Sequence, residues 1–123
     1  MKRMKLHDMS SDQLVERFAA IGIQQDEALL WNKIAKFNQL YEQKRVIEEE
    51  LKSRAGDQRS ALLPLYQHSN WQVRLNAVHA TLALDPQAGR QMLETIANSR
   101  HFPQAGDAGM SLVNLDRGIY KPR

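Results

Sequence analysis

The 123-residue sequence contains no cysteine. Without thiols the chain can form no disulfide, zinc–thiolate site or iron–sulfur cluster, and it has no cysteine nucleophile. No apolar run approaches the ~20 residues that a membrane-spanning helix needs. The basic segment 1–9 is not followed by the apolar stretch of a secretory signal. We therefore expect a cytoplasmic protein that does not insert into a membrane.

The body of the chain has no excess of positive charge, although the whole chain does. The net charge is +3 and the pI is about 9.4, values that favour a nucleic-acid partner. Five basic residues lie in the two ends, which leaves 12 basic against 14 acidic residues in 8–118. We expect the ends, 1–9 and 119–123, to be solvated tails. The slightly acidic body argues against binding to nucleic acid.

No segment alternates apolar and polar residues as a strand does, and the apolar spacing predicts an all-α protein of about six helices. Ser10 with Gln13 matches a capping box at the first start, Asp85-Pro86 matches a later start, and Gly56 matches a helix end. The expected helices are 10–30, 32–54, 57–67, 70–84, 85–98 and 103–118.

The first two helices predict an antiparallel hairpin over 10–54. On the second helix, helical spacing favours an inward stripe of Ile34, Phe37, Tyr41, Ile47 and Leu51. Its outer face carries i,i+4 charge pairs such as Arg45 with Glu49, which support a long solvated helix.

The second half has the texture of a helical repeat. Val73-Arg74 is followed by Ala77, Val78, Ala80 and Leu82, and this run resembles the second helix of a HEAT-like repeat. The resemblance implies two helix pairs over 57–118 that stack as a short α-solenoid, with the hairpin packed on one end. It gives Val73, Arg74, Ala77 and Ala80 structural roles in the repeat, with Arg74 bonding to a neighbouring repeat. We expect one domain over residues 1–123.

Several longer stretches are similar to a small bacterial family known as domain of unknown function twenty-nineteen. They are Gln25 to Leu30, Ile47 to Arg54, Gly56 to Arg59 and Phe102 to Met110. The resemblance runs from Ser10 to Pro122. It implies a short HEAT-like helical protein and no activity, cofactor or catalytic residue.

The residues supply no catalytic signature. Metal-dependent enzymes with HEAT-like folds place His-Glu pairs on several repeats, but this chain has no His-Glu dipeptide and its four histidines are dispersed. It also lacks a Gly-x-Ser-x-Gly elbow and a phosphate-binding glycine loop. We predict no catalytic, metal or cofactor site, and we keep the metal-dependent enzyme and the nucleic-acid binder as alternatives.

The remaining hypothesis is a protein–protein interaction module, for which a toxin-neutralising immunity protein is one concrete alternative. Gln72, Asn76 and His79 form one polar stripe at helical spacing, and Trp71 begins the same helix. In a solenoid such a stripe lines the concave surface, where partners bind. The stripe can also be the solvated side of an amphipathic helix. The residues leave open whether Trp31 and Trp71 lie in the core or at an interface, and whether the chain forms a homodimer.

Overall fold

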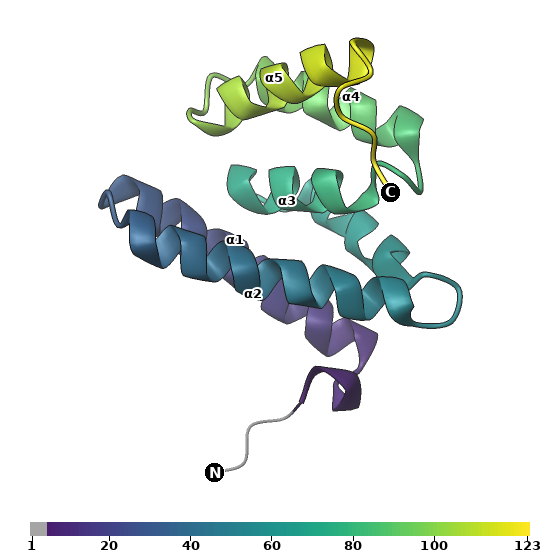
Figure 1. Ribbon diagram of the computed structural model, residues 1–123. Helices are drawn as coiled ribbons and strands as arrows, with labels where there is room; N and C mark the ends of the chain where they lie inside the picture. The colour runs from purple at the N-terminus through teal and green to yellow at the C-terminus, as the bar shows by residue number, and fades with distance from the viewer. Residues whose placement is uncertain (1–4) are drawn as a thin grey trace. The chain divides into compact units, whose positions relative to one another are not determined.

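The computed structural model describes residues 5–123, and this part of the chain is helical without a β-strand, as predicted (Figure 1). Residues 1–4, with two basic residues of the predicted N-terminal tail, lie outside the described part. The elements in order are η1 (Leu6–Asp8), α1 (Ser11–Leu30), α2 (Ile34–Ser53), η2 (Gln58–Gln67), α3 (Trp71–Thr81), α4 (Pro86–Ala97) and α5 (Gln104–Asp116).

All six expected helices have counterparts, but the third is a 3₁₀ helix. Pro64 lies inside this element, η2. Proline has no N–H to donate and its ring crowds the preceding turn, so a regular α-helix is disfavoured there. The short 3₁₀ helix still buries Leu62 and Tyr66. None of the described helices is both long and apolar enough to cross a membrane.

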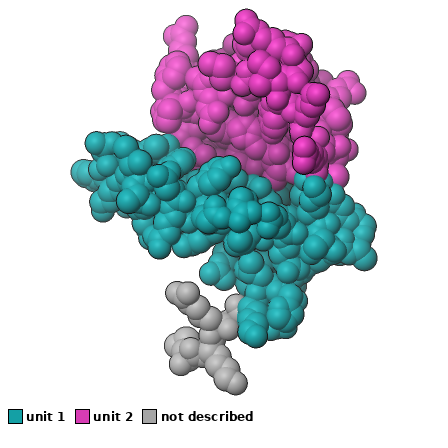
Figure 2. Space-filling model, in the orientation of Figure 1, with its two compact units in different colours: residues 1–62 teal, residues 63–123 magenta. Residues whose placement is uncertain are grey.

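The chain divides into two compact units, Met1–Leu62 and Leu63–Arg123 (Figure 2). The boundary falls inside η2, a few residues after the predicted junction between hairpin and repeats. We call them the N-terminal unit and the C-terminal unit and describe each by itself. The expectation of a single domain stays a prediction.

In the N-terminal unit, α1 packs along α2 as the predicted hairpin. Ser10 accepts a hydrogen bond from the backbone N–H of Gln13, and the Gln13 side chain accepts one from the Ser10 N–H, so the capping box is confirmed. The inner face of α1 buries Leu14 and Phe18 completely. Gly56, in the left-handed region at φ +79°, follows the end of α2.

The predicted inner face of α2 is partly wrong. Ile34 and Tyr41 are 63% and 50% exposed, and the buried positions are Leu40, Lys44, Ile47 and Leu51. These four lie at i, i+4, i+7 and i+11, one regular helical face. The second of these positions holds Lys44, so a search for apolar spacing does not find this face. Its stem is covered, while Nζ lies 2.6 Å from the Glu48 carboxylate and 4.7 Å from the Tyr41 ring centre.

Part of the predicted N-terminal tail is ordered. Residues 6–8 form η1, and the Arg54 guanidinium donates hydrogen bonds to the carbonyls of Leu6 and Met9 at 3.0 and 2.6 Å. Arg54 also forms an ion pair within α2 and its C-cap: its Nε lies 2.9 Å from Glu50 Oε2. An arginine has five donors in a rigid fork, so one side chain can hold both carbonyls. Sequence spacing gave no indication of this contact because the partners lie 45 and 48 residues away.

In the C-terminal unit, α4 packs against both α3 and α5. The predicted cap at Asp85 is present and accepts from Ala88 N–H; Asn70 likewise accepts from the N–H groups of the first turn of α3. Helix α3 ends at Thr81, three residues before the expected end, and a turn leads to Pro86. This is consistent with the bias of residues before proline against the helical region.

A buried hydroxyl pair also marks the end of α3. Tyr66 Oη and Thr81 Oγ1 lie 2.6 Å apart, and the Thr81 hydroxyl also donates to the Ala77 carbonyl. Burial raises the pKa of the Tyr66 phenol above its usual value. The pair therefore stays neutral at physiological pH and satisfies two polar groups inside the unit.

Candidate functional site

The predicted partner-binding stripe on α3 does not face solvent at Gln72 and Asn76. Their side chains are 6% and 4% exposed. Gln104 Nε2 of α5 donates to Gln72 Oε1 at 3.0 Å, and Gln72 Nε2 donates to Asn76 Oδ1 at 2.9 Å. The expectation of an exposed polar stripe is therefore wrong at these two positions, because α5 supplies complementary carboxamides that make burial tolerable.

The third member of the stripe, His79, is half-buried. His79 Nε2 lies 2.9 Å from the Ser111 hydroxyl, and the His79 ring meets the Tyr120 ring edge-on at 6.0 Å. Ser111 is only 8% exposed. The pair connects α3 to α5 inside the C-terminal unit, which fits a packing role rather than a reactive serine.

Trp71, left open between core and interface, is half-buried in a small stack. Its ring lies against His101 at 4.9 Å between centroids with planes 24° apart. The Arg74 guanidinium lies 4.5 Å from the centre of the Trp71 ring, and its Nε donates to the His68 carbonyl. His68 belongs to the turn before α3, so Arg74 holds its own turn rather than a neighbouring repeat. Val73, Ala77 and Ala80 are buried as predicted for small repeat positions.

The described residues contain no cluster of histidines and acids suited to bind a metal; His7 contacts Asp8 alone, at 3.1 Å. Within residues 5–123 no three His, Asp or Glu side chains lie close enough to share a metal ion. His68 Nδ1 accepts a hydrogen bond from the Asn70 N–H and so belongs to the turn.

The most exposed apolar feature lies at the α1–α2 turn. Leu30, Trp31 and Ile34 are 78%, 65% and 63% exposed, within five residues of one another. Leu30 is the most exposed large apolar side chain among the described residues. We call these three side chains, with Lys33 and Lys36, the hairpin tip. Trp31, the other open position, therefore lies at the surface.

The backbone of the hairpin tip is fixed by hydrogen bonds. Lys33 N–H donates to the Ala28 carbonyl at 2.7 Å and Asn32 N–H to the Leu29 carbonyl at 3.1 Å. Asn32 adopts the left-handed region at φ 54°. These two bonds and the left-handed residue make a Schellman motif, in which asparagine is the usual alternative to glycine. The tip therefore presents its apolar side chains from a defined turn.

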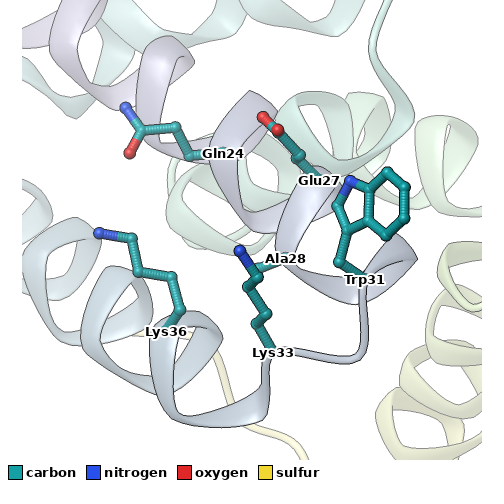
Figure 3. A pocket seen from close by; sticks show the side chains of 6 residues that line it. All are labelled: Gln24, Glu27, Ala28, Trp31, Lys33 and Lys36. Carbon is teal, nitrogen blue, oxygen red and sulfur yellow. The ribbon is translucent and has the colours of Figure 1, made fainter.

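A shallow hollow of about 180 Å³ lies beside Trp31 (Figure 3). Lys33 and Lys36 extend into it from the α2 side, and Gln24 and Glu27 border it from α1. No ion pair within the described part of the chain includes either lysine. The hollow thus combines an indole, two ammonium groups and one carboxylate. This chemistry can hold an apolar side chain with an acidic group next to it.

The sequence alone indicates one feature of the hairpin tip, the outward position of Leu30. The buried residues Leu14, Phe18, Ile21 and Ala28 define the inner face of α1, and Leu30 falls on the opposite side at 100° per residue. The apolar spacing of α2 instead predicts Ile34 in the core, because Ile34 lies seven residues before Tyr41, and this prediction is wrong.

Comparisons with known proteins give a family without a stated activity. The family described as "Domain of unknown function (DUF2019)" matches residues 12–116. The crystal structure of the protein RPA1889 from Rhodopseudomonas palustris CGA009 is similar with a TM-score of 0.94 and 50% identity, over 98% of this chain and 100% of that one. Curated proteins give no match. The chain therefore belongs to the DUF2019 family.

Proposed function

We propose that this protein is a non-enzymatic interaction module, a short HEAT-like helical scaffold that binds another protein through the hairpin tip. The observation that carries the proposal is the exposure of Leu30, Trp31 and Ile34 on a turn held by its own hydrogen bonds. Leucine, tryptophan and isoleucine in contact with water lose the ~1.5–3 kcal/mol each that full burial provides. Large exposed apolar groups gathered in one place are typical of a protein contact surface.

The charges of the tip indicate the chemistry of the partner. Lys33 and Lys36 stand beside Trp31 with one carboxylate, Glu27, so the hollow is positive by one charge. We infer a partner with an apolar cleft that receives Trp31 and an acidic rim that faces the lysines. Tryptophan is over-represented among residues that dominate binding energy, and a turn that is already ordered loses little entropy on docking.

The test is quantitative capture with the full chain and two variants. The chain is immobilised, exposed to extract of the source bacterium, and the retained proteins are quantified by mass spectrometry. A partner retained by wild type and by Val46→Ala, but lost with Trp31→Ala, supports the proposal. Val46 is a matched control because it is exposed on α2, twelve residues (about 18 Å of helix) from Ile34.

The partner's affinity is then measured directly. Trp31→Ala should cost about 2 kcal/mol or more, roughly a thirtyfold loss, as interface tryptophans commonly do. Lys33→Glu with Lys36→Glu should slow association and reverse its salt dependence, because the rim is acidic. Equal binding by Trp31→Ala and wild type would contradict the proposal.

A further inference from the structure

The outer face of α5 is an apolar surface that nothing in the described chain covers. Gly106, Met110, Val113 and Arg117 lie at i, i+4, i+7 and i+11, in one line along the helix. Met110 and Val113 are 59% and 42% exposed. The opposite face buries Gln104, Ala105, Ala108 and Ser111 against the C-terminal unit.

The glycines of α5 are not required by the packing of the chain itself. A Cβ added at Gly109 would meet nothing within 4 Å, and one at Gly106 would meet only Phe102 Cδ1 at 3.9 Å. At Gly89 in α4, by contrast, an added Cβ would lie 2.6 Å from Leu82 Cδ2, which explains that glycine. A glycine inside a helix costs up to ~1 kcal/mol relative to alanine. On α5 no contact among residues 5–123 offsets this cost, and glycines there suit the close approach of a second backbone.

Two charged residues, Asp107 at the edge of this face and Arg117 at its C-terminal end, are placed so that a reversed second copy can pair them. Asp107 lies near the N-terminal end of α5 and Arg117 lies at its C-terminal end. They are ten residues apart, about 15 Å along the helix, so they cannot pair with each other. The ion pairs described for residues 5–123 include neither of them.

An antiparallel second copy satisfies this pattern. A two-fold axis between Met110 and Val113 brings Met110 of each copy next to Val113 of the other. It also brings Asp107 of each copy close to Arg117 of the other. Phe102 and Ile119, just outside the two ends of α5, are also exposed, at 73% and 68%. A self-complementary patch is the signature of an isologous dimer.

We infer that two copies of the chain associate through the outer faces of their α5 helices in antiparallel orientation. The occupant of this face is thus a second copy of the chain, and the contact is independent of the hairpin tip. One short helix per copy makes a small interface, so we expect a reversible dimer whose population rises with protein concentration.

Sedimentation equilibrium of the full chain, from micromolar to millimolar concentration, tests the inference. Wild type should show a monomer–dimer equilibrium, and Met110→Glu should weaken it by about tenfold or more because it places two like charges at the axis. Ile23→Ser, an exposed apolar position on α1, is the control and should leave the equilibrium unchanged. A wild type that is monomeric throughout overturns the inference. So does a dimer that survives Met110→Glu, or one that is lost only with Trp31→Ala.

Charge exchange tests the orientation. Asp107→Arg and Arg117→Asp should each weaken the dimer, and the double variant should restore it, since each pair joins two copies. Failure of the double variant to restore the dimer would contradict the antiparallel register.

A variant that is expected to be more stable than wild type separates weaker association from loss of folding. Gly106→Ala with Gly109→Ala should raise the thermal midpoint of the dilute monomer, since both sites have room for a Cβ and alanine favours the helix. The same substitutions should weaken the dimer, because they hold the two backbones apart. A dimer that tightens with these alanines would overturn the close-approach argument.

Discussion

The two units bury polar side chains in different ways. The N-terminal unit has long helices whose polar groups mostly face water; it buries the charged Lys44, which pairs with the half-buried Glu48, and also Arg59 and the amide Gln25. The C-terminal unit has shorter helices and buries neutral groups that bond to one another: Gln72, Asn76, Gln104, Tyr66 and Thr81. A solvated polar face can be recognised from helical spacing. A buried amide chain cannot, because its residues look like a solvated face until their partners on another helix are known.

The largest expected effect comes from the apolar core of the hairpin. Phe18 is completely buried, so Phe18→Ala should lower the free energy of unfolding by about 3–5 kcal/mol through lost burial and a residual cavity. Phe102→Ala is the matched control, because that ring is 73% exposed and should change stability by less than about 0.5 kcal/mol. Urea unfolding of both variants, measured where the protein is monomeric, checks the contrast. If both variants lowered the free energy of unfolding equally, the difference in exposure between Phe18 and Phe102 would not account for their contributions to stability.

A smaller effect is expected from the amide chain of the C-terminal unit. Gln72→Ala removes the acceptor of Gln104 Nε2 and the donor to Asn76 Oδ1. Leaving buried polar groups without partners should cost about 1–3 kcal/mol. Gln91→Ala, at an exposed position on α4, should change stability by less than about 0.5 kcal/mol. Thermal unfolding distinguishes the two. If Gln72→Ala left the thermal midpoint unchanged, the hydrogen bonds between these amides would stabilise the fold no more than bonds to water do. The stripe would then behave like a solvent-exposed surface.

The contrast between local contacts and contacts with a distant helix also explains which features could be predicted from the sequence. The capping box at Ser10 and the Asp85-Pro86 start depend on neighbours within a few residues, and both are present in the structure. The register of α2 was missed because Lys44 occupies a core position, which apolar spacing excludes. The burial of Gln72 was missed because its partner Gln104 lies 32 residues away.

The candidate site was harder to predict than the fold. Local spacing indicates which residues of α1 turn inward, and therefore that Leu30 turns outward. It does not indicate that Ile34 stays outside, since α2 can be aligned in more than one register with its partner. Exposure of Leu30, Trp31 and Ile34 together depends on how two helices meet, so it appears only in the structure.

The smallest expected effect is a dependence on pH in the N-terminal unit. Arg59 hydrogen-bonds to the Asp57 carboxylate at 2.7 Å and lowers the pKa of Asp57 below its ordinary value. A pKa that is lower in the folded than in the unfolded chain stabilises the fold above about pH 4, and this contribution disappears as the pH falls through the folded pKa. Asp57→Asn should therefore destabilise the protein at pH 7 by less than about 1 kcal/mol, and hardly at all near pH 2.

Asparagine is suited to this position because Asp57 lies in the left-handed region at φ 49°, which asparagine tolerates. Urea unfolding at several pH values, with Arg59→Gln and the double variant, isolates the side-chain pair. The difference between Asp57→Asn and its parent should shrink when Arg59 is replaced, because of the Arg59 bonds only the backbone N–H of residue 59 then still donates to the Asp57 carboxylate. A difference that persists at low pH would mean that the Asp57 side chain supports the turn through its shape rather than its charge. In the amide and hydroxyl pairs of the C-terminal unit the bonded groups are neutral, so Gln72→Ala should cost the same at pH 4 as at pH 7. Acid would then weaken the Asp57–Arg59 pair but not these neutral pairs, which separates charged from neutral stabilisation within one chain.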